Sequence, residues 1–456
     1  MLNTAKENIL GTEKIGKLLW KFSIPAIIGQ IVNMLYTVVD RIYIGHIADA
    51  GGLAITGVGL VSPLTQIITG LGMLVGVGAS VKISLSLGKG DKERARQYLS
   101  GGIIGIWVIS ILITVLGSIF ADPILRLFGG TDATVGYGLA YLRPLLWGTI
   151  FNLTAFGLNG CISSDGNPKI GMLTMIIGAS INIVVDPILI FGFDLGIAGA
   201  AYATVISQLC AAFWLLHYFF RSKKAQLHID FRTLRLHKNV LMPLVAIGVA
   251  PCLMQIANSF VQVFSNNLLL THGGDLAIGA MTVMISICSI FIMPIFGLTH
   301  GCQPIMGFNF GAGQYARVRE TWKLVATYAT LILVVGYLGI MLIPQVMVSF
   351  FNSDPALTEI AVHGMRIYLF FFPLVGLQLT ATSFYQACGN PKKATLIGLT
   401  RQVLFLIPLF MVLPSFLGLD GIWISGAIAD LLSISLSMII IRRDFKKMRL
   451  SEGVCN

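Results

Sequence analysis

The sequence predicts an all-α integral membrane protein, with twelve transmembrane helices arranged as two parallel six-helix repeats. Of its 456 residues, 55% are hydrophobic and only 11% are charged, and the mean hydropathy is +0.84. A soluble domain carries about 25% charged residues, so a water-soluble fold does not account for this composition. Apolar runs of about 20 residues recur along the chain, and each is long enough to cross a hydrocarbon layer of about 30 Å.

The two repeats are visible as motifs that return after about 223 residues. Residues 87–90 (Leu-Gly-Lys-Gly) return as 310–313 (Phe-Gly-Ala-Gly), and residues 166–169 (Gly-Asn-Pro-Lys) return unchanged as 389–392. Other pairs with offsets between 222 and 226 are Arg94 and Arg317, Arg96 and Arg319, Arg143 and Arg366, Gly196 and Gly418, and Pro25 and Pro251. Duplicated membrane bundles of this kind commonly form transporters with a cavity between two similar lobes.

The apolar runs give the expected helices in order. They cover residues 17–46, 53–82, 96–121, 137–163, 169–192, 196–220, 239–271, 276–307, 320–345, 358–386, 394–415 and 420–441. We therefore expect an N-lobe over 1–220, a linker over 221–238 and a C-lobe over 239–456. Because each repeat has an even number of helices, the two repeats are expected to be parallel. Four glycines of the second helix are expected to allow close helix contact, namely Gly70, Gly72, Gly76 and Gly78.

The net charge of +11 follows membrane topology. Most of the 31 Lys and Arg residues lie in the N-terminal arm, the C-terminal tail, and the loops after the even-numbered helices. The largest loop group is Arg221, Lys223, Lys224, Arg232, Arg235 and Lys238. Basic loops stay in the cytoplasm, so both termini are expected there, in a multi-pass protein of the plasma or inner membrane. This distribution argues against a nucleic-acid partner.

Several motifs of catalysis are absent from the sequence. There is no G-x-x-x-x-G-K-[ST] loop for nucleotide phosphates, no H-E-x-x-H and no G-x-S-x-G. The seven cysteines contain no C-x-x-C pair and are interpreted as small apolar residues. We therefore expect a non-enzymatic protein without a cofactor, which takes its energy from an ion gradient or runs downhill.

Charged residues inside the membrane point to function, because burying a charge there costs several kcal/mol. Asp40 lies near the outer end of the first helix, and Asp186 lies in the outer half of the fifth. Asn182 is one turn before Asp186 on the same helix face, and Thr204 lies at a matching depth in the sixth helix. These oxygen-bearing groups suit a proton or a hard cation such as Na⁺.

The alternative reading makes Asp186-Pro187 a helix-end cap. The second repeat argues for an ion site, because the positions 223 residues after Asn182 and Asp186 are the apolar Phe405 and Leu409. A scaffold role would be expected in both lobes.

The C-lobe contains a different charged pair. Arg401 and Asp430 lie at matching depths in the last two helices, and we expect a structural ion pair between them, in preference to a direct role in transport. The equivalent residues Arg143 and Arg366 are expected to extend to the outer membrane interface.

Three short motifs of the first helix carry a family resemblance. Residues 22–25 (Phe-Ser-Ile-Pro), 33–36 (Asn-Met-Leu-Tyr) and 39–40 (Val-Asp) resemble the opening of the multidrug and toxic compound extrusion (MATE) family. Residues 166–201 are similar to helices 4 to 6 of that family, and the resemblance runs through roughly residues 15–445. Where the NorM-like branch keeps acidic residues on helices 7 and 10, this chain offers amides, so it looks like a member of the DinF-like, MepA-like branch.

This resemblance implies roles for individual residues. The family's cation site falls on Asp40, Asn182, Asp186 and Thr204, which would hold H⁺ or Na⁺. Tyr36, Tyr141 and Asn159 correspond to polar residues that support this site in the family. Pro25 corresponds to the proline at which the first helix bends. The implied function is a cation-coupled antiporter that exports lipophilic, often cationic, organic compounds by alternating access.

The cavity, the partners and the competing functions follow from this reading. A cleft lined by Met and Phe tolerates varied flat ligands. The candidate lining residues are Met34, Met172, Met175, Met254, Met281, Met284, Phe156 and Phe384.

We expect a monomer whose partners are small lipophilic substrates and membrane lipids. A lipid-linked precursor flippase of the same superfamily is the alternative, although it would need more cavity charge than Arg401 supplies. A major facilitator transporter does not fit the loop at 87–96.

The expected topology can be tested by labelling single introduced cysteines with a membrane-impermeant reagent. Residues 222–238 should react only from the cytoplasmic side, and residues 47–52, 193–195 and 272–275 only from outside. External labelling of the basic 222–238 loop would invert the orientation and contradict the argument from charge.

Overall fold

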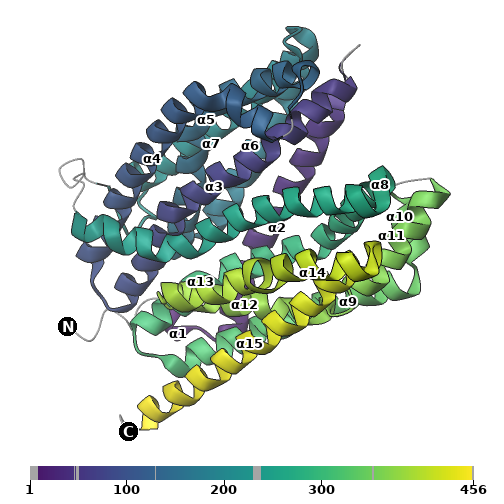
Figure 1. Cartoon of the computed structure of the whole chain (residues 1–456). Helices are drawn as coiled ribbons and strands as arrows, with labels where there is room; N and C mark the ends of the chain where they lie inside the picture. Colours follow the sequence, from purple (N-terminus) through teal and green to yellow (C-terminus); the bar gives the residue numbers. More distant parts are fainter. Residues whose placement is uncertain are drawn as a thin grey trace.

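The computed structural model describes residues 9–45, 47, 51–128, 130–229, 238–351 and 354–453, and within these ranges it contains helices and no strand. Among the described residues, eleven helices are long and apolar enough to cross a membrane, or twelve when one bent pair is counted as a single span. The expected fold class of an all-α multi-pass membrane protein is therefore confirmed. Figure 1 shows two groups of helices, an earlier one and a later one, while the internal repeat itself stays a prediction.

Most helices of the N-lobe extend beyond their expected bounds, by up to six residues. They are α1 (Ile9–Thr12), α2 (Ile15–Gly45), α3 (Gly51–Gly88), α4 (Lys92–Leu127), α5 (Asp132–Ser164), α6 (Pro168–Pro187) with the π-helical η1 (Ile188–Gly192), and α7 (Gly196–Arg221). Asp91 caps α4 by accepting a hydrogen bond from the backbone of Arg94. Pro168 occupies the first turn of α6, where a missing N–H is tolerated.

The C-lobe begins with α8 (Lys238–Gly311), which contains two spans joined at Gly274. Gly274 has φ of +66°, a conformation that a glycine adopts without a Cβ clash, and the chain turns there. The remaining elements are α9 (Tyr315–Leu342), α10 (Pro344–Ser349), α11 (Pro355–Tyr368), α12 (Phe372–Ala387), α13 (Pro391–Leu399), η3 (Thr400–Leu406), α14 (Ile407–Leu417) and α15 (Leu419–Gly453).

The single helix expected over 358–386 is wrong in detail. The structure has α11 and α12 there, bent by 58° at a short break. Pro373 lies in the first turn of α12, where it has no N–H to donate to the preceding turn. The short helices α1 and α10 were not expected from the apolar runs, since each is far shorter than a membrane span.

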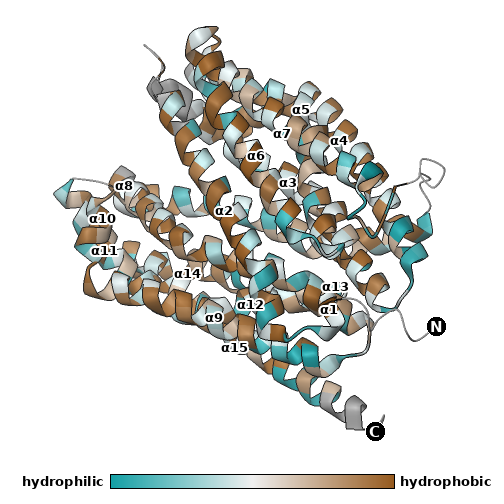
Figure 2. Cartoon of the chain, turned by 180° about the vertical axis from the view of Figure 1, so that it is seen from behind, coloured by the Kyte–Doolittle hydropathy of each residue, from teal (hydrophilic) through white to brown (hydrophobic). Residues whose placement is uncertain are grey.

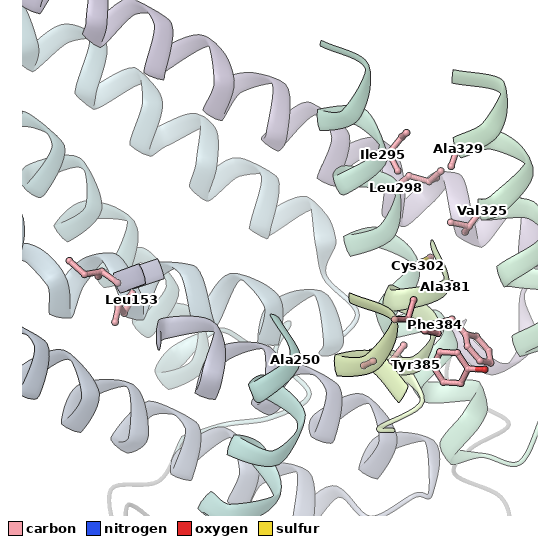
Figure 3. Packing of buried hydrophobic residues seen from close by; sticks show 14 of the residues in the cluster. Leu153, Ala250, Ile295, Leu298, Cys302, Val325, Ala329, Ala381, Phe384 and Tyr385 are labelled. Atoms are coloured by element: carbon pink, nitrogen blue, oxygen red, sulfur yellow. The ribbon is translucent and has the colours of Figure 1, made fainter. Parts of the chain in front are cut away.

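The core and the surface follow the chemistry of a membrane solvent. Figure 3 shows Ile295, Leu298 and Cys302 of α8 facing α9 and α12, where Ala329 and Phe384 meet them, and all five are buried. Large apolar side chains also remain on the outside of the bundle, as lipid allows. Hydrophilic residues gather at the end of the bundle where both chain termini lie (Figure 2), which we call the termini end.

Glycines bring the helices into backbone contact, as expected for the second helix. A Cβ on Gly76 would lie 2.8 Å from the Cα of Gly157 in α5. At the termini end, a Cβ on Gly88 would lie 2.0 Å from the carbonyl oxygen of Phe308, and one on Gly311 would lie 2.3 Å from that of Leu85. This contact is reciprocal. Gly311 lies 223 positions after Gly88, and Phe308 lies 223 positions after Leu85, as a two-fold relation between the lobes would require.

The first helix of each lobe packs against the other lobe at the termini end. The ring of Trp20 in α2 lies 4.9 Å from that of Tyr328 in α9, and a Cβ on Gly301 of α8 would meet the backbone of Ser23. Conversely, the start of α8 packs on the N-lobe, where Gly78 of α3 and Gly101 of α4 accommodate Leu244 and Val240. The two lobes therefore interlock at this end.

The linker after α7 is fixed to the N-lobe by one carboxylate. Asp165, in the loop between α5 and α6, accepts hydrogen bonds from the Tyr218 hydroxyl (2.7 Å) and from the backbone N–H groups of Gln226 and Leu227 (3.0 Å each). Asp165 is fully buried, and this burial raises the pKa of its carboxyl to about 6, although the three donors oppose the shift.

Arg401 and Asp430 form the expected ion pair across η3 and α15. Asp430 is 2% exposed and Arg401 21% exposed, so the pair is shielded from water. Its structural role stays a prediction, because contact alone does not separate support from participation in transport.

The Asp165 carboxyl gives a prediction about pH. Because its pKa in the docked linker is about 6, against an ordinary 3.8, the docked form binds a proton more strongly than the released form. Docking should therefore weaken as the pH rises from about 4 to about 6 and stay constant above that range. Hydrogen exchange at the amides of Gln226 and Leu227, corrected for intrinsic rates, measures this directly. Asp165→Asn should exchange faster with no such pH dependence; a persisting dependence would assign the titration elsewhere.

The Arg401–Asp430 pair gives a prediction about stability. Arg401→Gln or Asp430→Asn alone should lower the yield of folded protein, because each leaves a buried charge without its partner, at a cost of about 3 kcal/mol or more. The double variant should recover part of the loss, measured by detergent-resistant folded fraction and melting temperature. Strictly additive losses in the double variant would show that the pair is not a structural unit.

Candidate functional site

A cavity lies on the N-lobe side of the bundle. Its walls come from α2, α3, α5, α6 and α7, and the empty space between them is about 1350 Å³, part of it open to the outside of the protein. The C-lobe contributes only three residues of α8, namely His300, Gln303 and Pro304. Most residues that line this cavity therefore come from the N-lobe, and the expected cavity between two similar lobes stays a prediction.

The cavity wall combines apolar surface with neutral hydrogen-bonding groups. Phe156, Met172 and Met175 supply part of the apolar wall, as expected. The polar side chains are amides, hydroxyls and one imidazole. They include Gln30, Asn33, Tyr36, Ser80, Asn152, Asn159, Asn182, Gln208 and His300. No Lys, Arg, Asp or Glu is among the described residues that line the cavity.

Asn182 is the centre of a polar cluster at the edge of this cavity. Its Nδ2 donates to Oδ1 of Asp186 (3.2 Å) and to Oγ1 of Thr204 (3.4 Å). Asn182 and Asp186 are 1% and 0% exposed. The other oxygens, Oδ1 of Asn182 and Oδ2 of Asp186, are buried and accept no hydrogen bond from the described residues. The structure thus brings together three of the four expected ligands.

Asp40 and Tyr36 lie on α2, within electrostatic range of this cluster. Asp40 is buried and lies within electrostatic range of Asp186, and Tyr36 lies within range of both carboxyl groups. Two carboxylates this close repel each other when both are ionised, so a proton or cation bound there relieves the repulsion. Carboxylate, amide and hydroxyl oxygens are the ligands that a hard cation prefers.

The helix continues beyond Asp186, which argues against the reading of Asp186-Pro187 as a helix-end cap. Pro187 ends the α-helical hydrogen bonding, but the chain runs on as the π-helical η1 to Gly192. Such π-helical turns are frequent at functional sites. Asp186 is therefore an interior residue of a continuous span.

The remaining predicted residues fall into two groups. Pro25 and Asn159 line the cavity, Pro25 lies inside α2, and the Asn159 amide donates to the backbone oxygen of Gly171 (2.9 Å). Tyr141 is buried in α5 and is not among the residues that line the cavity. Of the Met and Phe candidates outside the lining, Met281, Met284 and Phe384 are buried in the C-lobe core, and Met254 packs against Gly398. Met34 is partly buried on α2.

Sequence reasoning missed Gln30, Asn152, Gln208, His300 and Gln303. A signal was available, because Gln208 is one helical turn after Thr204, and Asn152, Phe156 and Asn159 follow at helical spacing. Carboxylates are rare and conspicuous inside a membrane span, whereas the described lining residues of this cavity carry no Lys, Arg, Asp or Glu.

The MatE family matches residues 25–188 and 251–412, which together exceed half of the chain. The chain therefore belongs to the multidrug and toxic compound extrusion (MATE) family of membrane transporters. It is similar to the multidrug export protein MepA of Staphylococcus aureus (strain MRSA252), with 29% identity over 425 residues and 93% of both chains covered. MepA of Staphylococcus saprophyticus is 28% identical over 437 residues, covering 95% of this chain and 96% of that protein.

Solved structures agree with this assignment. The MATE multidrug transporter DinF-BH is 36% identical, with a TM-score of 0.89 and 96% of this chain and 97% of that chain covered. An outward-facing MATE transporter of the MOP superfamily has a TM-score of 0.91 at 23% identity, covering 98% of each chain, and supports the fold.

Proposed function

We propose that this protein is a cation-coupled antiporter that exports lipophilic, often cationic, organic compounds. The coupling ion is H⁺ or Na⁺, held by Asp40, Asn182, Asp186 and Thr204, and transport proceeds by alternating access. The related MepA proteins are multidrug exporters, and DinF-BH is a multidrug transporter, which supports the class of substrate.

One observation carries the proposal. Asn182 lines the cavity and also donates hydrogen bonds to Asp186 and Thr204, and Tyr36 likewise lines the cavity within range of both carboxyl groups. The proposed substrate cavity and the proposed ion site therefore share the side chains of Asn182 and Tyr36. A ligand that displaces Asn182 or Tyr36 changes the groups around the carboxylates, so occupancy by one favours release of the other.

The cavity wall supports an organic substrate over a lipid-linked precursor. A pyrophosphate headgroup needs cationic partners, and no Lys or Arg is among the described lining residues. Met and Phe side chains beside amides accommodate flat, partly polar molecules of varied shape. The flippase alternative is therefore not favoured.

The ion site is tested with the protein in vesicles, by ethidium efflux driven by an imposed pH or Na⁺ gradient. Asp40→Asn and Asp186→Asn should each abolish gradient-driven efflux while membrane insertion persists, because the charge is lost and the apolar helix surface is kept. Asn182→Ala and Thr204→Ala should slow efflux by about tenfold, since each removes one neutral ligand. The gradient that drives efflux identifies the ion.

The matched control is Asp122→Asn, which removes an exposed carboxylate paired with Arg126 on the protein surface. It should leave efflux unchanged, as should Phe405→Ala and Leu409→Ala at the repeat counterparts. Normal gradient-driven efflux in the Asp40→Asn, Asp186→Asn double variant would refute the site and the coupling mechanism together.

A further inference from the structure

A short N-terminal segment is held on the C-lobe by one arginine. The Arg317 guanidinium, at the start of α9, donates through one nitrogen to the backbone oxygens of Leu10 (3.2 Å) and Glu13 (2.7 Å). Its Nε donates to Oδ1 of Asn309 (2.9 Å). Asn309 in turn donates to the backbone oxygens of Leu10 (2.9 Å) and Ile305 (2.8 Å).

This contact, which we call the α1 anchor, joins the partly buried Arg317 to two fully buried residues. Asn309 is 0% exposed, and Leu10 is 1% exposed. Ile15, Leu18 and Leu19 continue the buried face into α2. Figure 1 shows α1 beside the later helices, although it precedes the first span of the N-lobe. Charged hydrogen bonds to backbone carbonyls are strong where water is excluded.

The helix that follows the anchor crosses from one lobe to the other. Near its start, α2 contacts the C-lobe through Trp20 and Ser23. Further along, α2 packs on the N-lobe, where a Cβ on Gly29 would meet Met175 of α6 and the ring of Tyr43 lies 6.5 Å from that of Phe191. Pro25 lies near the crossing, after Ser23 and before Gly29, and Ile27 still approaches Gly297 of α8.

The corresponding arginine of the N-lobe is used differently. Arg94, 223 residues before Arg317, donates to the Tyr98 hydroxyl (3.5 Å) and lies over the Tyr98 ring, within its own helix. The position equivalent to Asn309 is Ser86. The inter-lobe contact is therefore particular to Arg317, and Arg94 provides a matched comparison.

We propose that Arg317 and Asn309 are positioning residues for transport, which fix the start of α2 to the C-lobe so that movement between the lobes bends α2 and reaches Asp40. With its start held by one lobe and its far half packed on the other, α2 takes up any relative displacement along its length. Pro25 interrupts its hydrogen bonding and is the place where bending costs least. Without the anchor, the start of α2 keeps only its packing contacts with the C-lobe through Trp20 and Ser23, so displacement of the C-lobe is passed less fully to the ion site.

The mechanical part of this proposal is measured without transport. Spin labels at Lys14 and Lys323, both exposed, report whether α1 stays on the C-lobe, in a full-length background without the seven native cysteines. The unsubstituted protein should give one narrow distance distribution at all pH and Na⁺ conditions. Arg317→Gln should broaden it, and Arg94→Gln should not. An unchanged distribution in Arg317→Gln would refute the anchor, whatever the transported substrate.

The functional part rests on the proposed antiport and separates rate from binding. Arg317→Gln should lower gradient-driven efflux by about tenfold, as expected for loss of charged hydrogen bonds, while ethidium affinity at the cavity changes less than about two-fold. Arg317→Lys, which keeps the charge, should restore part of the rate. Asn309→Ser, the residue of the other repeat, offers a milder variant if Arg317→Gln does not fold.

The outcomes distinguish the alternatives. Full efflux in Arg317→Gln with a released α1 would refute the link between anchor and transport. Equal losses in Arg94→Gln would indicate a general effect of the loop arginines and also refute it. If the unsubstituted protein transports nothing, the antiport is wrong, and the distance measurement still decides whether the anchor exists.

Discussion

The packing of α2 against both lobes is the contact on which the other features depend. Its start lies on α8 and α9, its far half lies on α6, and it carries Pro25, Tyr36 and Asp40 along one continuous helix. The cavity wall, the ion cluster and the α1 anchor each include residues on α2 or directly before it. A helix shared in this way cannot follow both lobes rigidly when they move apart, so it deforms or one contact breaks.

Much of the fold could be predicted from the sequence, because lipid imposes a simple rule on segment length and polarity. The broken span at 369–371 and the π-helical stretches could not, since they depend on how prolines and neighbouring helices satisfy individual backbone groups. The sequence also did not predict that α2 and the start of α8 each pack against the opposite lobe. Nothing in an apolar run states which other run it contacts.

The candidate site was predicted in part for a similar reason. Carboxylates inside the membrane are rare enough to identify Asp40 and Asp186, and helical spacing adds Asn182. Neutral residues such as Gln208 and His300 are visible as cavity residues only when several helices are placed in space. Arg94 and Arg317 occupy equivalent repeat positions, yet their partners differ, because Arg317 faces the backbone of α1 and Arg94 faces Tyr98 of its own helix.

The reciprocal contact of Gly88 and Gly311 makes the termini end a natural fulcrum. Backbones touch there without intervening side chains, so the relative movement of the lobes in the proposed alternating access would turn about this contact. The α3 helix is 38 residues long, about 57 Å at 1.5 Å per residue. A rotation of about 10° at one end therefore carries the other through about 10 Å, the width of a flat aromatic molecule. A larger side chain at either glycine would move the fulcrum itself and alter both lobes at once.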